Sequence, residues 1–168
     1  MNRLLAGLLD FARPRPPEWR DVHVREVLDS VVELVRHSAG KNVRFEIDSA
    51  EDLPALRCDR EQLAQVVMNL ALNAAQAMPG GGTVRLSAAA DDGGVLIKVA
   101  DEGEGLSGEP MERIFEPFFT TKVTGTGLGL AVVQQIVVRH AGTVKATRND
   151  GRGMTFAIHL PHSPERRQ

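Results

Sequence analysis

Four amide side chains recur along one side of residues 59–78, where apolar residues spaced three and four positions apart predict a helix. They are Gln65, Asn69, Asn73 and Gln76. No charged residue occurs between Glu61 and Arg85, although a solvated helix face usually carries Lys and Glu. Carboxamide oxygens are hard ligands that suit Mg²⁺, which takes few protein ligands. The stripe indicates a sheltered face with specific hydrogen bonds; a neutral surface that tolerates Asn is the alternative.

A carboxylate, Asp101, follows the predicted strand 95–100 and opens a segment that also holds Gly103 and Gly105. At a strand end in a cleft, a carboxylate can accept a hydrogen bond from the exocyclic amine of adenine, whereas the carbonyl of guanine would repel it. An aspartate that forms a turn before glycine is the other interpretation.

Glycines at alternate positions precede another predicted helix, which spans 128–140. The run reads Gly125, Thr126, Gly127, Leu128, Gly129 and Leu130. Glycine lets the backbone approach a ligand closely, and the free N–H groups and dipole of a helix N-terminus favour phosphate. Together with Asp101, the run predicts a nucleotide site.

A loop rich in phenylalanine joins the two glycine segments. In order, it contains Phe115, Phe118, Phe119, Thr120, Thr121 and Lys122. Long loops are often lids, and apolar anchors allow a lid to fold over a ligand and release it. The ammonium of Lys122 is placed to reach a terminal phosphate. A hydrophobic loop packed permanently on the core is the alternative.

Two common nucleotide motifs are excluded. Gly103, Gly105 and Gly108 match the glycine spacing of a dinucleotide-binding fold, which requires a long helix directly afterwards and an acidic residue about twenty positions on. The helical segment that begins at Pro110 is short, and no acidic residue occurs over 117–149. The phosphate-binding sequence Gly-x-x-x-x-Gly-Lys-Ser/Thr is absent.

The composition is that of one globular domain. The 168 residues include 20 Lys and Arg against 22 Asp and Glu, so nothing favours nucleic acid or an anionic membrane as a partner. Cys58 is the one cysteine, which excludes an internal disulfide. No stretch approaches the roughly 20 apolar residues of a membrane span, and the first residues lack the features of a secretory signal. We therefore expect a cytoplasmic module without direct membrane insertion.

The hydrophobic patterns predict an α+β fold. Helices are expected over 21–38, 59–78 and 128–140, and strands over 43–47, near 56, and over 83–90, 95–100, 143–147 and 154–160. Asp59 is the expected N-cap of the second helix, with Gln62 as its capping-box partner. We expect a two-layer α/β sandwich whose mixed, mainly antiparallel sheet carries about three helices on one face.

The two ends are expected to lie outside this domain. Apolar residues at helical spacing over 1–13 predict the end of a helix that continues upstream, or a helix folded back onto the domain. The prolines of 14–20 predict a stiff linker. The main domain is expected over 21–161 and a loose polar tail over 162–168.

Taken in order, these segments resemble the catalytic, ATP-binding domain of bacterial sensor histidine kinases, most closely the nitrogen-regulation type. The N, G1, F, G2 and last glycine boxes of that family resemble residues 65–78, 101–105, 115–119, 125–130 and 151–156 in turn. The resemblance covers residues 20–161, and five motifs in order make it specific. It implies the Bergerat fold, which type II topoisomerases and Hsp90-like chaperones share, with a mobile ATP lid.

The resemblance also implies roles for single residues. Asn73 would coordinate Mg²⁺ on the ATP phosphates, Asp101 would bind adenine, and Asn69 and Lys122 would act on the triphosphate. Further nucleotide contacts are implied for Gly103, Gly105, Phe115, Thr120, Thr121, Gly125, Thr126, Gly127, Leu128, Gly129, Leu130 and Thr155. Hydrolysing relatives carry a Glu at the position of Asn69 that activates water, and an amide cannot act as a general base. The site is expected to hold ATP for an outside nucleophile.

That nucleophile is implied to be a histidine on an upstream dimerisation and phosphoacceptor domain, whose last helix turns resemble residues 1–13. The five histidines of this chain lack the acceptor motif. The chain alone is therefore expected to bind Mg·ATP without phosphorylating itself, and a response regulator is the implied partner of the full-length kinase.

Two residues depart from the family pattern. Gln76 stands where many relatives carry Lys, and Met154 stands where Thr is usual. Two other functions stay open: a Bergerat-fold serine kinase or anti-sigma-type switch, and an ATP-sensing interaction module without phosphoryl transfer.

Overall fold

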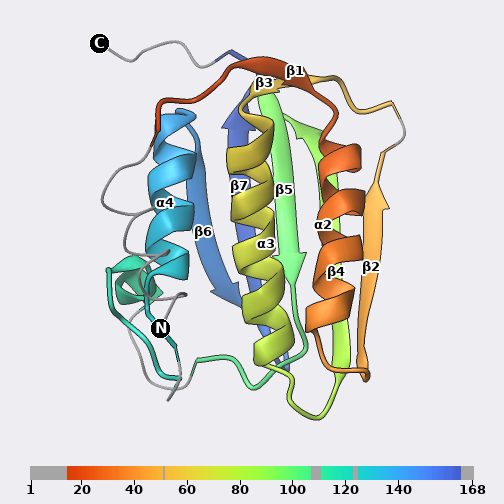
Figure 1. Cartoon of the computed structure of the whole chain (residues 1–168), viewed down its shortest axis with the longest axis vertical. Helices are drawn as coiled ribbons and strands as arrows, with labels where there is room; N and C mark the ends of the chain where they lie inside the picture. The colour runs from red at the N-terminus through yellow and green to blue at the C-terminus, as the bar shows by residue number, and fades with distance from the viewer. Residues whose placement is uncertain (1–14, 51, 107–110, 123–124, 164–168) are drawn as a thin grey trace.

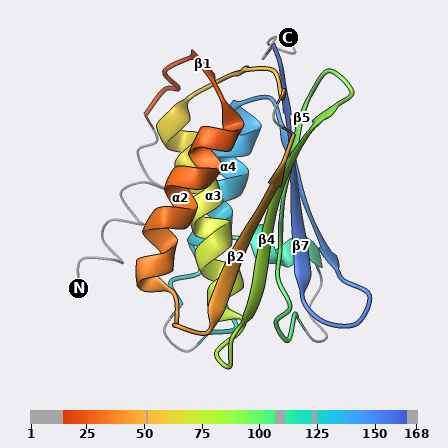
Figure 2. The same cartoon turned by 90° about the vertical axis from the view of Figure 1, so that its right-hand side faces the viewer.

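The computed structural model describes residues 15–50, 52–106, 111–122 and 125–163. These residues form two layers, a five-stranded sheet and three helices packed on one of its faces (Figures 1 and 2). The helices are α2 (Val24–Ser38), α3 (Arg60–Gln76) and α4 (Gly129–Arg139), and a short 3₁₀ helix, η1, spans Met111–Phe115. The predicted α+β sandwich is confirmed. No helix within these ranges is long and apolar enough to cross a membrane.

The sheet is mixed, and one pair of its strands is parallel. Its order is β2 (Val43–Ser49), β4 (Gly82–Asp91), β5 (Gly94–Ala100), β7 (Met154–Pro161) and β6 (Thr143–Arg148). β2 runs parallel to β4, and the other neighbouring strands are antiparallel. A parallel pair needs a crossover connection, which α3 supplies. In Figure 1, α3 and β5 both end toward the bottom of the view, so residues after each can meet there.

The core lies between the two layers. α2 buries one stripe consisting of Val24, Val27, Leu28, Val31, Val32 and Val35. α3 buries its apolar side against the sheet, with Leu63, Val67 and Leu70 at most 2% exposed. The strands contribute alternate residues such as Val84, Leu86, Val95, Ile97, Val99, Phe156 and Ile158. Because the apolar side of α3 is buried against the sheet, the amide stripe lies on a side of the helix that does not pack on the sheet.

The first helix begins later than predicted. We expected it from residue 21, but Arg20–Val22 form strand β1, which pairs antiparallel with β3 (Leu56–Cys58). Val22 is buried opposite Leu56, and His23 has an extended backbone that separates the strand from α2. A β-branched residue with a strand partner thus outweighs the helical periodicity at this point.

Asp59 caps α3 as predicted, but the capping box is incomplete. Asp59 Oδ1 accepts the N–H of Gln62 at 3.0 Å. The side chain of Gln62 does not return to Asp59; its Nε2 donates to the carbonyl oxygen of Arg15 at 3.1 Å. The expected partnership was wrong because the N–H of Asp59 already donates to Nε2 of His140, at 3.1 Å.

The proline-rich segment packs across the N-terminus of α3 and the C-terminus of α4. The guanidinium of Arg15 lies 3.0 Å from the buried carboxylate of Asp59 and 2.7 Å from Glu61. The carbonyl oxygen of Arg15 accepts from Arg139, the last residue of α4, at 3.2 Å. The segment therefore joins both helices. The expectations for 1–13 and for 164–168 concern residues outside the described ranges, and the domain boundaries stay predictions.

A buried histidine completes this end of the molecule. His140 is 2% exposed, and the ring of Trp19 meets it edge-on with 4.9 Å between ring centroids. Nε2 accepts from Asp59 and Nδ1–H donates to the carbonyl of Ile136 at 2.9 Å, so both bonds require the neutral ring. Burial lowers the pKa of His140, although the Ile136 bond and the charge of Asp59 act in the other direction.

Acidification is expected to destabilise the fold through His140. Since its pKa is lower in the folded state than the unfolded value of about 6.5, the unfolded chain takes up the proton first. The contribution of His140 to stability is complete above that value, and it falls by up to about 1.4 kcal/mol per pH unit until the pH reaches the lowered pKa of the folded state. Urea unfolding at several pH values should show this loss, and His140→Gln should reduce it. His37→Gln, at an exposed position, is the matched control; an equal effect of both substitutions would contradict the assignment.

Candidate nucleotide-binding site

The amide stripe of α3 faces α4 and the phenylalanine-rich loop. Nδ2 of Asn69 donates to the carbonyl oxygen of Gly129, the first residue of α4, at 3.3 Å. Asn73 and Gln76 both accept from Lys122. Asn69 and Asn73 are half-buried, and Gln76 is exposed. These contacts favour the sheltered face over the neutral surface.

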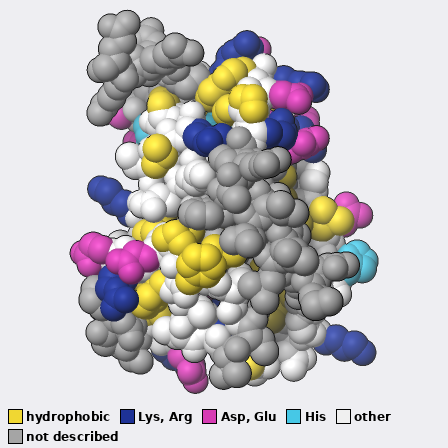
Figure 3. Space-filling model, turned by 60° about the vertical axis from the view of Figure 1, so that its left-hand side comes forward, with side chains coloured by type: hydrophobic (Ala, Val, Ile, Leu, Met, Phe, Trp, Pro, Cys, Tyr) yellow, Lys and Arg dark blue, Asp and Glu magenta, His cyan; other side chains and the backbone are white. Residues whose placement is uncertain are grey.

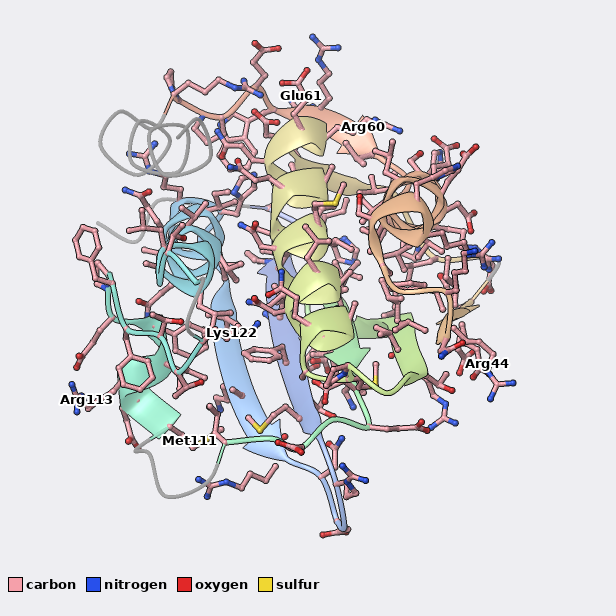
Figure 4. The ribbon with its side chains drawn as sticks, turned by 60° about the horizontal axis from the view of Figure 1, so that its bottom comes forward. Arg44, Arg60, Glu61, Met111, Arg113 and Lys122 are labelled. Carbon is pink, nitrogen blue, oxygen red and sulfur yellow. The ribbon has the colours of Figure 1, made fainter. Side chains whose placement is uncertain are left out.

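Lys122 reaches α3 from the loop, as Figure 4 shows. Its Nζ lies 3.3 Å from Oδ1 of Asn73 and 2.8 Å from Oε1 of Gln76. Burial lowers the pKa of Lys122, and the negative charge of Asp101 opposes this shift. The amide oxygens of Asn73 and Gln76 therefore accept from an ammonium group in this structure, and the Mg²⁺ expected at the stripe stays a prediction.

Asp101 directly follows β5 and is 4% exposed. Its Oδ1 accepts the N–H of Gly103 at 2.8 Å and that of Met154 at 3.3 Å. Both bonds end on Oδ1, so within the described residues Oδ2 is the oxygen left for a ligand. Burial raises the pKa of Asp101, while these two bonds and the charge of Lys122 lower it. Gly103 is buried and Gly105 half-buried in the segment that follows.

The turn between β6 and β7 packs against the backbone of Asp101. Gly153 has φ +91°, and a Cβ there would collide with the carbonyl oxygen of Asp101. The same oxygen accepts from Nδ2 of Asn149 at 2.9 Å, and Thr155 Oγ1 donates to Oδ1 of Asn149 at 2.6 Å. The hydroxyl of Thr155, a predicted nucleotide contact, is thus bonded to Asn149. Sequence reasoning missed Asn149, whose one signal is its place two residues before a turn glycine.

The three phenylalanines of the loop differ in burial and in the groups that they contact. Phe115 is half-buried and meets Phe156 edge-on, with 6.5 Å between ring centroids. Phe119 is half-buried beneath the guanidinium of Arg113, 5.2 Å from its ring centroid. Phe118 is 62% exposed with φ +67°. Figure 3 shows several separate groups of hydrophobic side chains on the face turned toward the viewer. Two rings therefore anchor the loop, and its motion as a lid stays a prediction.

The glycine run leads directly into α4. Gly127 has φ +68°, and a Cβ there would collide with the backbone of Phe118. The carbonyl oxygen of Gly127 accepts the N–H of Phe118 at 2.9 Å, which brings the loop against the run. Thr126 Oγ1 accepts the N–H of Leu128 at 3.4 Å, Leu128 is buried, and α4 begins at Gly129. Residues 123 and 124 lie outside the described ranges.

The remaining predicted contacts lie around this centre. Thr120 Oγ1 accepts the N–H of Lys122 at 3.1 Å, which shapes the turn at the tip of the loop. Thr121 and Gly125 are exposed, and Leu130 is half-buried on the first turn of α4. The structure thus brings the amide stripe, Lys122 and the start of α4 together, whereas contact of each side chain with nucleotide stays a prediction.

Known proteins share this fold. The family described as histidine kinase-, DNA gyrase B-, and HSP90-like ATPase matches residues 58–164, more than half of the chain. The chain belongs to this ATPase family. Among solved structures, the catalytic domain of histidine kinase ThkA superimposes with a TM-score of 0.81 at 31% identity, over 89% of this chain and 99% of that domain. Full-length ShkA in complex with AMPPNP gives 0.83 at 30% identity, over 97% of this chain and 37% of ShkA.

Curated relatives of the chain are named as histidine kinases. Sensor histidine kinase ZraS of Escherichia coli (strain K12) is 36% identical over 162 residues, which are 96% of this chain and 35% of ZraS. Signal transduction histidine-protein kinase AtoS of the same strain is 36% identical, over 100% of this chain and 28% of AtoS. The chain spans 35% or less of the length of these two relatives. The resemblance to histidine kinase catalytic domains is confirmed, and the nitrogen-regulation subtype stays a prediction.

Proposed function

We propose that the chain binds Mg·ATP between α3 and the phenylalanine-rich loop and, in its parent protein, donates the γ-phosphoryl group to a histidine on an upstream domain. One observation carries the proposal: Lys122 bonds the amide oxygens of Asn73 and Gln76 within electrostatic reach of Asp101. A single centre therefore offers an acceptor for the amine of adenine and a cation for phosphate.

The donor set at α3 fits Mg²⁺. Oδ1 of Asn73 is a neutral oxygen that already accepts from an ammonium, at 3.3 Å, and Mg²⁺ is usually held by one or two protein ligands with waters and substrate phosphates. When bound, the ion would neutralise phosphate charge. Asn73 would hold it, and Lys122 would turn from the amides to the terminal phosphate.

Asn69 supports transfer to an outside nucleophile rather than hydrolysis. Its amide is bonded to the carbonyl of Gly129 and has no basic group to take a proton from water. In the proposed step an imidazole nitrogen forms a bond to the γ-phosphorus, the bond to the β–γ bridging oxygen breaks, and ADP leaves. The imidazole proton passes to solvent.

The test is transfer from labelled ATP to the upstream helices of the parent protein, supplied in trans. The expected product is labelled on histidine and therefore labile in acid, and no label should appear on the chain alone or on helices whose acceptor histidine is replaced. Acid-stable label on serine would favour the serine-kinase alternative. Tight ATP binding without any transfer would favour the interaction module, and rapid ATP hydrolysis by the chain alone would contradict the role of Asn69.

A response regulator is the proposed downstream partner of the full-length kinase. The support is a structural relative, histidine kinase ThkA in complex with response regulator protein TrrA, which superimposes with a TM-score of 0.83 at 26% identity. The proposal for this chain extends that likeness to the parent protein, whose upstream domain would carry the phosphoryl group first.

A further inference from the structure

The end of β6 and the turn that follows it are hydrogen-bonded to both ends of the segment that carries Asp101. At one end, Nδ2 of Asn149 donates to the carbonyl oxygen of Asp101 at 2.9 Å. At the other end, Nε of Arg148 donates to the carbonyl oxygen of Leu106 at 2.9 Å. The turn itself is closed by the N–H of Asn149, which donates to the carbonyl of Gly153 at 3.1 Å. Arg148, the last residue of β6, and Asn149, which follows it, therefore bracket residues 101–106.

The direction of each side-chain bond at Asn149 is fixed. A backbone carbonyl can only accept, so the nitrogen of the Asn149 amide must face Asp101. The amide oxygen then faces Thr155, whose hydroxyl donates to it at 2.6 Å. Thr155 thereby selects the orientation of the amide that suits Asp101.

The carbonyl held by Asn149 belongs to the peptide that joins Asp101 to Glu102. The N–H of Gly103, in the peptide that follows, donates to Oδ1 of Asp101 at 2.8 Å. Rotation of this peptide would move the N–H of Gly103 and with it the carboxylate. The bond from Asn149 thus bears on where Oδ2 points, although Asn149 does not touch Oδ2.

We infer that Asn149, oriented by Thr155, is a positioning residue for recognition of the nucleotide base: it holds Asp101 so that Oδ2 meets the exocyclic amine of adenine. The inference rests on the proposed function, because it deepens the role given to Asp101. Asn149 is half-buried, and its side-chain amide is hydrogen-bonded to Asp101 and Thr155, which are both predicted nucleotide contacts.

Nearly isosteric substitutions test the inference. Asn149→Asp places an acceptor against the carbonyl of Asp101, and Thr155→Val leaves Oδ1 of Asn149 without its donor. Thr155→Ser keeps the hydroxyl. Asp150→Asn, at an exposed position of the same turn, is the control for altered charge in the turn. Circular dichroism and thermal unfolding establish that each variant folds.

The readout is the ratio of dissociation constants for ADP and IDP, measured by calorimetry on the full chain. IDP has a carbonyl in place of the amine at position 6 and a hydrogen on N1, so the ratio reports on the edge of the base that Asp101 would meet. We expect Asn149→Asp and Thr155→Val each to reduce the preference for ADP about fivefold or more, the effect of one misplaced buried hydrogen bond. Thr155→Ser and Asp150→Asn should keep the preference of the natural chain.

Each contrary result has a distinct meaning. Equal weakening of ADP and IDP, or an unchanged ratio in both test variants, would overturn the positioning role and leave the proposed function standing. If the natural chain itself fails to prefer ADP, the adenine contact of Asp101 is wrong, and the proposed base recognition falls together with the inference.

Discussion

Replacing Asp101 with asparagine is expected to reverse the base preference of the site. Oδ1 must still accept two backbone N–H groups, so the amide nitrogen of the new side chain takes the place of Oδ2. A donor at that point repels the amine of adenine and pairs with the carbonyl of inosine. Calorimetry with ADP and IDP should show the preference moving toward IDP by about 100-fold or more.

The matched control for Asp101→Asn is Glu104→Gln. It removes the same charge from the same loop at an exposed position. The control should keep the preference for ADP. If Asp101→Asn instead weakened ADP and IDP by the same factor, Asp101 would serve the fold of the loop and not the recognition of the base.

Acid should act on Asp101 in the same direction as the asparagine substitution. Because burial raises the pKa of Asp101, its carboxyl begins to take up a proton at a higher pH than an ordinary aspartate. A protonated Oδ2 is a donor, so the preference for ADP should fall as the pH is lowered from neutral toward the raised pKa. The Asp101→Asn chain should show no such change.

Replacing Asn73 with alanine is expected to remove most of the gain in ADP affinity that Mg²⁺ gives. Mg²⁺ takes few protein ligands, so loss of one oxygen ligand should lower the affinity for the ion at least roughly tenfold. Loss of a residue that only supports a metal ligand already has an effect of that size. In the trans assay, transfer should fall on the order of 100-fold, as when a group that stabilises transition-state charge is removed. Titration of ADP with and without Mg²⁺ measures the first effect, and label on the acceptor histidine measures the second.

Asn73→Asp is the matched variant, because it keeps an oxygen where Oδ1 lies. It should retain dependence on Mg²⁺, while Asn73→Ala should lose most of that dependence. An alanine variant whose affinity still rises with Mg²⁺ as in the natural chain would show that the metal ligand lies elsewhere.

Elements that are specified by residues close together in the sequence were predictable. The apolar spacing of α3, its cap at Asp59 and the hairpin of β4 and β5 depend on residues close together in the chain, and the structure has them within a few positions. The amide stripe and Lys122 were also singled out from the sequence, because uncharged polar residues on a helix and a lysine in an apolar loop are unusual locally. Their roles toward nucleotide stay predictions.

Contacts between distant segments were not predictable in this way. Asn149 bonds a carbonyl 48 positions earlier, and Arg15 bonds a carboxylate 44 positions later. Neither residue differs in type or spacing from ordinary turn and linker residues, so no periodicity marks it. The sequence analysis missed the pairing of β1 with β3 for the same reason. The strand at Val22 depends on Leu56, a partner far away in the sequence.

The packing of Trp19 on His140 determines what the natural fluorescence of this protein can report. The chain has one tryptophan and no tyrosine, so its emission under tryptophan excitation arises at the linker end. Asn73 lies about 20 Å further along α3 than Asp59, at 1.5 Å per residue. A change of emission on adding nucleotide would therefore report a displacement carried along α3 or α4, and not a nucleotide lying against the indole.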